Sequence, residues 1–315
     1  MLTQIGRGVG RFGIRVRAAV AQVIEALTAE DGVELAAEDG LILGFDLVES
    51  APAPTEADVY ILSGQSNASG LVPVADAPAD LDAAIAGVET WVKPNKSTDN
   101  SGWLETLYLG ENNSTENPGL YWGPEMQMAY DIAQSVTDGR RVVLIKYSEN
   151  GRGLDQDSGT EDFHPNSTGD LYNILVDGYI KPALNELIAQ GLTPRIRGFC
   201  WMQGEQDSKT VASSGEYDVN LTALISALRA DVAADLPFVI GRLSDAQIAS
   251  GNFPYLSTVQ QAQDQVAAAT ANCSIVNTDS LTTLDGVHYD GPSVIQLGSD
   301  FATESQALTP VTYGA

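Results

Sequence analysis

Apolar and polar residues alternate along positions 58–305 in two rhythms, one typical of buried strands and one typical of amphipathic helices. Strands that alternate with helices form a parallel sheet covered on both faces. The pattern therefore predicts an α/β fold, a three-layer α/β/α sandwich around a central five-stranded parallel sheet. The predicted strands are 59–63, 142–147, 196–202, 237–243 and 274–277, and the predicted helices lie near 124–137, 171–190, 216–233 and 256–271, with a last one beginning at Pro292.

Residues 71–122 interrupt this rhythm, because they are rich in asparagine, glycine and aromatic residues. They predict a long insertion at the carboxyl edge of the sheet. The proline- and alanine-rich residues 51–57 predict a linker. The main domain is then expected over 58–305, and residues 306–315 are expected to form a C-terminal tail.

The first 50 residues differ from the rest in pattern and in charge. Residues 11–27 predict an amphipathic helix with a basic stripe, followed by a repeat in which Ala-Glu-Asp-Gly occurs at 29–32 and again at 37–40. The Asp-Gly pairs indicate hairpin turns, and 41–47 alternates as a half-buried strand does. So few strands cannot bury a core alone. We expect residues 1–50 to serve attachment or oligomerisation.

Composition excludes several classes of protein. The 315 residues are 43% hydrophobic and 18% charged, which is typical of a globular domain and not of a disordered chain. No secretory signal and no apolar run of membrane-spanning length is seen. The net charge of −26 argues against a nucleic acid or an anionic membrane as partner. Cys200 and Cys273 are expected to be buried thiols, and their number excludes a disulfide framework or a cysteine-ligated zinc site.

Three polar segments follow predicted strands or lie near the end of the chain. The first predicted strand runs into Gly64-Gln65-Ser66-Asn67, which places a serine at the sheet edge where ligands bind in open α/β folds, although a helix N-cap serine would look the same. A second strand runs into 203–207. In Asp285-Gly-Val-His288 the two side chains lie about one turn apart, so the carboxylate can hold one ring nitrogen and leave the other to take a serine proton.

Five ordered segments carry a family resemblance. The chain resembles the SGNH (GDSL-like) hydrolases, in the branch of sialate O-acetylesterases and acetyl xylan esterases. The resemblance implies a flavodoxin-like sandwich over about four-fifths of the chain. The matching segments are 58–67, 122–125, 144–151, 201–207 and 285–289.

Carried over residue by residue, the resemblance implies a serine mechanism. Ser66 would be the nucleophile, His288 the general base, and Asp285 the group that orients the imidazole. The oxyanion hole would consist of the backbone N–H groups of Ser66 and Gly151 and the side-chain amide of Gln203, which stands where the wider superfamily uses asparagine. No metal and no organic cofactor is required.

The chain departs from the family pattern at three places. The second segment continues as Gly151-Arg-Gly153, where relatives have a Gly-Gly pair, so both glycines are candidates for the oxyanion donor. Met202 replaces an aromatic residue or histidine before Gln-Gly-Glu. Glu205 is an alternative acid for His288, and we favour Asp285 because of its local spacing.

Candidate substrate-binding residues are Asn67, Trp122, Trp103 and Glu125. Aromatic faces suit sugar rings, and the insertion also carries several asparagines that could bond sugar hydroxyls. The alternative, which we favour for the aromatic residues, is that they fill a small satellite core under a long loop. His164 lies in a turn-like context and is expected to be structural or to lie at the surface.

We interpret the chain as a serine esterase that removes O-acetyl groups from a carbohydrate, with an acetylated glycan as its partner. The alternative is a catalytically silent carbohydrate-binding module. Residues 1–50 resemble the attachment segments of bacteriophage fibres, which places the protein on a virion or outside the cell. A homo-oligomer, with a trimer as the first state to test, or contacts with virion proteins would then form through these residues.

Overall fold

The computed structural model describes residues 55–113, 119–156, 161–168 and 171–314. The chain divides into two units, Met1–Pro52 and Ala53–Ala315. The predictions for residues 1–50, and all but the last residues of the predicted linker, lie outside the described residues. Everything that follows concerns the second unit.

A single large sheet forms the centre of the fold, in the order β4-β3-β6-β1-β7-β8-β9. The short β10 pairs with the first half of β7. A second sheet contains only β2 and β5. The strands are β1 (Glu56–Gly64), β2 (Val72–Pro73), β3 (Ala84–Val92), β4 (Trp103–Tyr108), β5 (Tyr121–Trp122), β6 (Arg141–Ser148), β7 (Thr193–Met202), β8 (Phe238–Gly241), β9 (Cys273–Val276) and β10 (Val311–Thr312).

The five predicted strands are β1, β6, β7, β8 and β9, and all four pairings between them are parallel. Their order in space, β6-β1-β7-β8-β9, is the flavodoxin-like order, which confirms the predicted fold class. The central strands β1 and β6 are buried along nearly their whole length, because helices cover both faces of the sheet.

The insertion differs from its prediction. Part of residues 71–122 widens the sheet, since β3 pairs in parallel with β6 and β4 pairs antiparallel with β3. The alternation of apolar residues in 84–92 was hidden among polar neighbours, so the sequence pattern did not reveal this strand. The predicted C-terminal tail also joins the sheet, because β10 pairs antiparallel with β7.

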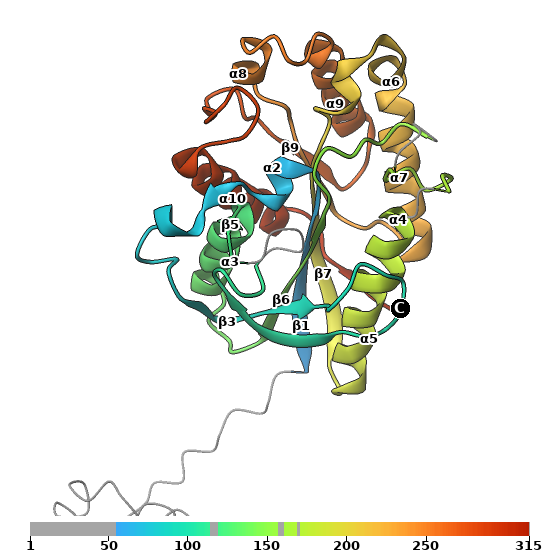
Figure 1. The fold of residues 1–315 in the computed structure, drawn as a ribbon. Coiled ribbons are helices and arrows are strands. Elements are labelled where there is room, and N and C mark those ends of the chain that lie inside the picture. The colour runs from blue at the N-terminus through green and yellow to red at the C-terminus, as the bar shows by residue number, and fades with distance from the viewer. Residues whose placement is uncertain (1–54, 114–118, 157–160, 169–170, 315) are drawn as a thin grey trace, which may run out of the picture. The chain divides into compact units, whose positions relative to one another are not determined.

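Helices cover the two faces of the sheet in two groups (Figure 1). Helices α3 and α10 pack together on one face, and α5, α7 and α9 lie on the other. Pro124 begins α3 and the Asp290 side chain caps α10 by accepting from Ser293 N–H, as helix starts favour. The helices are α2 (Ser66–Ser69), α3 (Pro124–Ser135), α4 (Leu171–Asn173), the π-helical η3 (Ile174–Ile180), α5 (Lys181–Ala189), α6 (Val211–Gly215), α7 (Tyr217–Asp231), α8 (Asp245–Ile248), α9 (Leu256–Ala269) and α10 (Gly291–Ala307), with 3-10 turns η2 (Val74–Asp76) and η4 (Asp207–Lys209).

None of the helices in the described ranges combines the length and the apolar character that crossing a bilayer requires. The parallel strands β1, β6 and β7 end side by side, and their carboxyl ends carry the polar segments that the sequence singled out. The candidate site is therefore sought at this edge.

Candidate active site

The turn after β1 delivers Ser66 to the sheet edge. Gly64 adopts φ +139°, and a Cβ on it would lie 2.0 Å from the carbonyl oxygen of Met202, so a glycine is required where β1 and β7 end together. Gln65 N–H donates to that same carbonyl at 3.0 Å. Ser66 then opens the short helix α2 and is 4% exposed.

His288 and Asp285 form a hydrogen-bonded pair. His288 Nδ1 lies 2.8 Å from Asp285 Oδ2, and the other carboxylate oxygen accepts the backbone N–H groups of His288 and Val287 at 2.8 and 2.9 Å. Partial burial raises the pKa of Asp285, but these hydrogen bonds outweigh it and hold the pKa below its ordinary value. The carboxylate is thus ionised at neutral pH and orients the ring, which leaves Nε2 as the nitrogen that can accept a proton.

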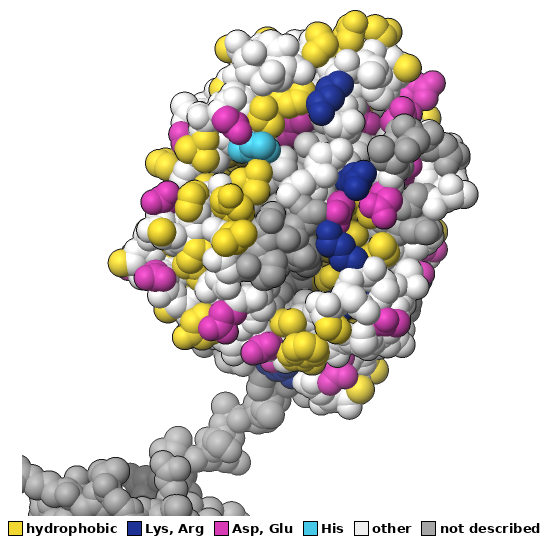
Figure 2. All heavy atoms as spheres, in the orientation of Figure 1, with side chains coloured by type: hydrophobic (Ala, Val, Ile, Leu, Met, Phe, Trp, Pro, Cys, Tyr) yellow, Lys and Arg dark blue, Asp and Glu magenta, His cyan; other side chains and the backbone are white. Residues whose placement is uncertain are grey.

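Ser66 and His288 line one cavity of about 560 Å³. Gln65, Gly151 and Lys209 line it too. No hydrogen bond joins Ser66 to His288 in the described structure, which is common for catalytic pairs without substrate. On this face a histidine lies at the surface, and separate basic side chains lie farther across the same face (Figure 2). The structure thus brings the predicted nucleophile and base to one hollow.

Asn67 has a different place from the one predicted. It is 3% exposed, and its amide holds the backbone on both sides of His288. Nδ2 donates to the Val287 carbonyl at 3.1 Å, and Oδ1 accepts the Tyr289 N–H at 3.0 Å. Nδ2 also donates to Glu205 Oε1. Asn67 is therefore buried and holds the backbone of the histidine segment, and neither feature suits contact with a sugar.

Glu205 belongs to this network, but among the described side chains neither a hydrogen bond nor an ion pair joins it to the His288 ring. Its Oε1 accepts from Asn67 and, at 3.1 Å, from Gln247, while Oε2 is buried without a hydrogen-bond partner. Burial raises its pKa, although the two amides and the charge of His288 oppose the shift. Of the two candidate acids, Asp285 is the one in hydrogen-bond contact with His288.

The two candidate glycines of the 148–154 segment are placed differently. Gly151 lines the cavity with φ +67°, a left-handed conformation that favours glycine. Gly153 is buried, and a Cβ on it would lie 3.3 Å from Asp207 Oδ1. The cavity thus offers the backbone N–H of Gly151, not that of Gly153, as a candidate oxyanion donor.

Gln203 does not line the cavity, which corrects its expected place in the oxyanion hole. It is fully buried, and its Nε2 donates to Asp207 Oδ2 at 2.5 Å and lies 3.2 Å from both Gln65 Oε1 and the Arg152 carbonyl. Its Oε1 accepts the Tyr217 hydroxyl at 3.0 Å. With three acceptors around its two amide hydrogens, Gln203 has none to offer an oxyanion.

Gln65 lines the cavity, and Gln203 does not. The backbone N–H of Gln206 donates to Gln65 Oε1 at 3.1 Å, and a backbone N–H can only donate, so the oxygen must face inward. The amide nitrogen makes no hydrogen bond with the described residues, and Gln65 lines the cavity. In the sequence, the position of Gln65 next to Ser66 could have indicated it as a candidate donor. The sequence analysis did not consider Gln65, because the family's amide donor follows a later strand.

Two other predicted substrate-binding residues are buried. Trp122 and Glu125 are both 0% exposed, so neither can touch a sugar. Glu125 Oε2 forms an ion pair with Lys146 at 2.6 Å, and Lys146 Nζ also donates to the Ser69 carbonyl at the end of α2. The pair therefore anchors the helix that carries Ser66. Burial lowers the pKa of Lys146 although Glu125 opposes the shift.

The remaining predictions fall away from the cavity. Trp103 is 49% exposed on the edge strand β4, where its indole N–H donates to Glu105, and it does not line the cavity. His164 is buried. Cys200 is a buried free thiol and Cys273 a half-buried one. Among the described residues no three His, Cys, Asp or Glu side chains gather as metal ligands.

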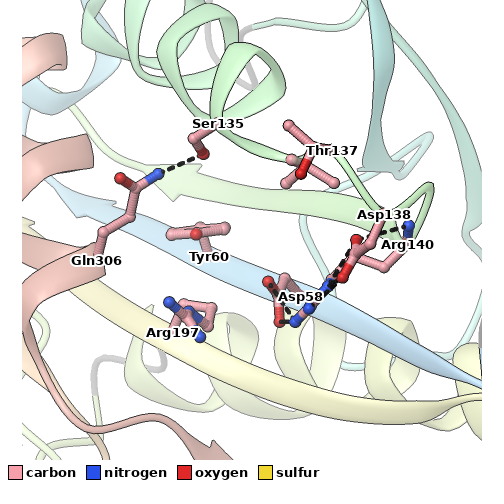
Figure 3. A pocket seen from close by; sticks show the side chains of 9 residues that line it. Asp58, Tyr60, Ser135, Thr137, Asp138, Arg140, Arg197 and Gln306 are labelled. Carbon is pink, nitrogen blue, oxygen red and sulfur yellow. Dashed lines mark hydrogen bonds and ion pairs between the residues drawn. The ribbon is translucent and has the colours of Figure 1, made fainter.

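A second polar cavity, of about 310 Å³, lies between β1, β7 and the ends of α3 and α10 (Figure 3). Arg140 reaches both Asp138 and Asp58 there, at 2.9 and 3.4 Å, and Gln306 donates to Ser135 at 2.8 Å. Arg197 lines the same cavity. We call it the amino-edge cavity, because its strand residues lie near the starts of their strands.

Comparison with known proteins identifies the family. The model of the carbohydrate esterase, sialic acid-specific acetylesterase family matches residues 56–307. This chain belongs to that family. The prediction of an SGNH-type carbohydrate O-acetylesterase, an enzyme that hydrolyses carboxylic esters, is thereby confirmed. No curated protein sequence matches the chain.

Solved structures share the fold of this chain at low sequence identity. A protein of Arabidopsis thaliana is 19% identical, with a TM-score of 0.62, over 81% of this chain and 98% of its own. NanS is 15% identical, with a TM-score of 0.58, over 82% and 98%. A carbohydrate acetylesterase of Xanthomonas citri is 18% identical, with a TM-score of 0.57, over 80% of this chain and 56% of that longer one.

Proposed function

We propose that this acetylesterase works by acyl transfer to Ser66. Ser66 Oγ attacks the acetyl carbonyl carbon while its proton moves to His288 Nε2, and Asp285 stabilises the imidazolium that forms. The bond from the carbonyl carbon to the sugar oxygen then breaks, and the sugar oxygen takes that proton. Water, activated by His288, hydrolyses the acetyl-enzyme to acetate. The observation that carries the proposal is the shared cavity of Ser66 and the Asp285-held His288.

The oxyanion would meet three donors that are in place before the reaction. They are the backbone N–H groups of Ser66 and Gly151 and the side-chain amide of Gln65, all from residues that line the cavity. Donors fixed in this way stabilise the tetrahedral intermediate without reorganising at the moment of reaction.

For the substrate we propose an O-acetylated sugar that carries a carboxylate, as sialic acid does. Among the described residues that line the cavity, Lys209 is the one lysine or arginine. Its Nζ lies 2.8 Å from Gln206 Oε1, and no acid within the described ranges forms an ion pair with it. In a protein with a net charge of −26, a cation at this place favours an anionic substrate that the rest of the surface repels.

The test is acetate release from O-acetylated sialic acid and from neutral acetylated xylan, with Ser66→Ala as the blank. Lys209→Gln is expected to raise KM for the sialic acid about tenfold, because a hydrogen bond to a charged group is lost, and to leave xylan unaffected. Lys181→Gln, on α5, removes the same charge away from the cavity and is the matched control. A wild-type enzyme that prefers acetylated xylan would refute the proposal that the substrate carries a carboxylate. Equal changes of KM in Lys209→Gln and Lys181→Gln would refute it too. Activity in Ser66→Ala would refute the mechanism.

We also propose, on the sequence alone, that residues 1–50 attach the esterase to a virion or assemble it into an oligomer. Deleting them should leave an active enzyme whose mass in light scattering is that of one chain. An unchanged assembly would refute this role.

A further inference from the structure

Asp207 is a buried carboxylate that the proposed reaction does not use. It opens η4, is 1% exposed, and lies at the end of the segment that follows β7. Both of its oxygens accept the backbone N–H of Leu154, at 3.0 and 3.1 Å, and Oδ2 also accepts Gln203 Nε2 at 2.5 Å. Burying a carboxylate costs free energy unless hydrogen bonds compensate it, so the groups that donate to Asp207 indicate its structural role.

The first set of bonds leads to Gln65. A carboxylate can only accept, so the nitrogen of Gln203 must face Asp207. That nitrogen also lies 3.2 Å from Gln65 Oε1. With its oxygen held by Gln203 and by the Gln206 N–H, Gln65 is left with its amide nitrogen toward the cavity. Asp207 thus fixes the orientation of the amide two hydrogen bonds away.

The second set of bonds leads to Gly151. Leu154 N–H is the point at which the 150–154 turn is tied to Asp207, and Gly153 packs against the same carboxylate. Gly151, earlier in the turn, lines the cavity. One side chain therefore holds both segments that supply oxyanion donors besides Ser66.

We propose that Asp207 is the positioning residue of the oxyanion hole, which aligns the Gln65 amide through Gln203 and the Gly151 N–H through Leu154. The proposal rests on the serine mechanism above. Asp207 touches neither substrate nor reacting atoms, and its effect on the reaction comes from alignment, to which acyl transfer is sensitive.

The charge state of Asp207 bears on this role. Burial raises its pKa to about 7, against the lowering effect of the Gln203 and Leu154 hydrogen bonds, and the carboxylate of Asp155 raises it further. The titratable side chains that face it are Asp155, from the loop after the turn, and Tyr217, from α7. As the pH falls through about 7, Asp207 takes up a proton and ceases to be a full acceptor. The hydrogen bonds of Asp207 to Gln203 and Leu154 then weaken. Because these bonds align both donor segments, we expect kcat to fall.

The first test is Asp207→Asn, which keeps the shape but offers one acceptor oxygen to the three donors, Gln203 Nε2 and the backbone N–H groups of Leu154 and Asp155. We expect kcat for an aryl acetate to fall about 100-fold, the scale of a small misplacement, with KM little changed. Combined with Gln65→Glu, the loss should be smaller than the product of the two single losses, since both act on one donor. A kcat within about threefold of wild type in a folded Asp207→Asn would overturn the proposal.

The second test leaves Asp207 in place, so it can be carried out even if the Asp207→Asn variant does not fold. Asp155→Asn removes a neighbouring negative charge but no hydrogen bond to Asp207. We expect an unchanged maximal kcat and an acid limb of the pH profile displaced to lower pH, because the pKa of Asp207 falls. An unmoved limb would overturn the proposal. Ser66→Ala separates the two levels, because an inactive Ser66→Ala with an unaffected Asp207→Asn refutes the positioning role alone.

Discussion

The two polar cavities differ in how their polar groups are partnered. In the cavity at the carboxyl edge, Ser66 Oγ and the amide nitrogen of Gln65 make no hydrogen bond with the described residues, although both lie beside well-bonded neighbours. In the amino-edge cavity, Arg140 is held by two carboxylates and Gln306 bonds Ser135 (Figure 3).

Arg197 is the apparent exception in the amino-edge cavity, because its Nε is buried without a partner. Helices α3 and α10 both end there, and the carbonyl ends of helices favour a nearby cation. The comparison teaches that polarity alone does not mark an active site. What marks it is a group that can donate or accept, held in place by neighbours but left without a partner of its own.

The largest effect should come from Gln65→Glu. This change keeps the oxygen that accepts from Gln203 and Gln206 but turns the cavity-facing donor into an acceptor. Loss of one oxyanion donor costs about 10²–10³ in kcat, and we expect at least that for an aryl acetate. Gln206→Glu is the matched control, since it places the same acid in the same cavity. Equal kcat in the two variants would show that Gln65 has no special role.

A smaller effect, on stability, is expected from Glu205→Gln. Burial raises the pKa of Glu205, so above its ordinary value of 4.5 the folded state keeps a proton that the unfolded state has released. Stability is therefore lost as the pH rises through this window. From about pH 5 to about pH 8 the Tm of the wild type should fall more than that of Glu205→Gln. Asp76→Asn, an exposed site, controls for net charge, and parallel Tm curves for wild type and Glu205→Gln would contradict the assignment.

The smallest effect is expected at the amino-edge cavity. Arg140→Gln removes the ion pair with the exposed Asp138 and the longer one with the buried Asp58, from which Arg195 remains 4.0 Å away as a second cation. Urea unfolding should show a loss of about 1 kcal/mol or less. The value of kcat/KM should be that of the wild type. A marked loss of activity would show that the amino-edge cavity takes part in the reaction. It would contradict the distinction drawn between the two cavities.

The sequence predicted the five central strands and the covering helices because each buries a regular apolar face. It did not predict β3 and β10. Residues 84–92 show the irregular pattern of a strand near the sheet edge, and β10 is only two residues long. Both pair with strands that were already recognised, so their signal lies in the tertiary structure and not in local periodicity.

The candidate site was predicted where the chemistry is local. Asp285 and His288 are three residues apart, and the structure places their side chains 2.8 Å from each other. The roles of Asn67, Gln203 and Gln65 depend on which amide atom faces which neighbour over separations of 138 to 222 residues. No spacing in the sequence carries that information, which is why we propose Gln65, and not Gln203, as the amide donor only after the hydrogen bonds are known.

The amide of Asn67 also joins the segment of Ser66, the proposed nucleophile, to the segment of His288, the proposed base. Asn67 follows Ser66 in the chain and binds the peptide groups before and after His288. Any opening that carried the histidine loop away would have to break these bonds. We therefore expect the segments that carry Ser66 and His288 to stay together while these bonds persist, and the Tyr289 amide to exchange with solvent hydrogen only when they break.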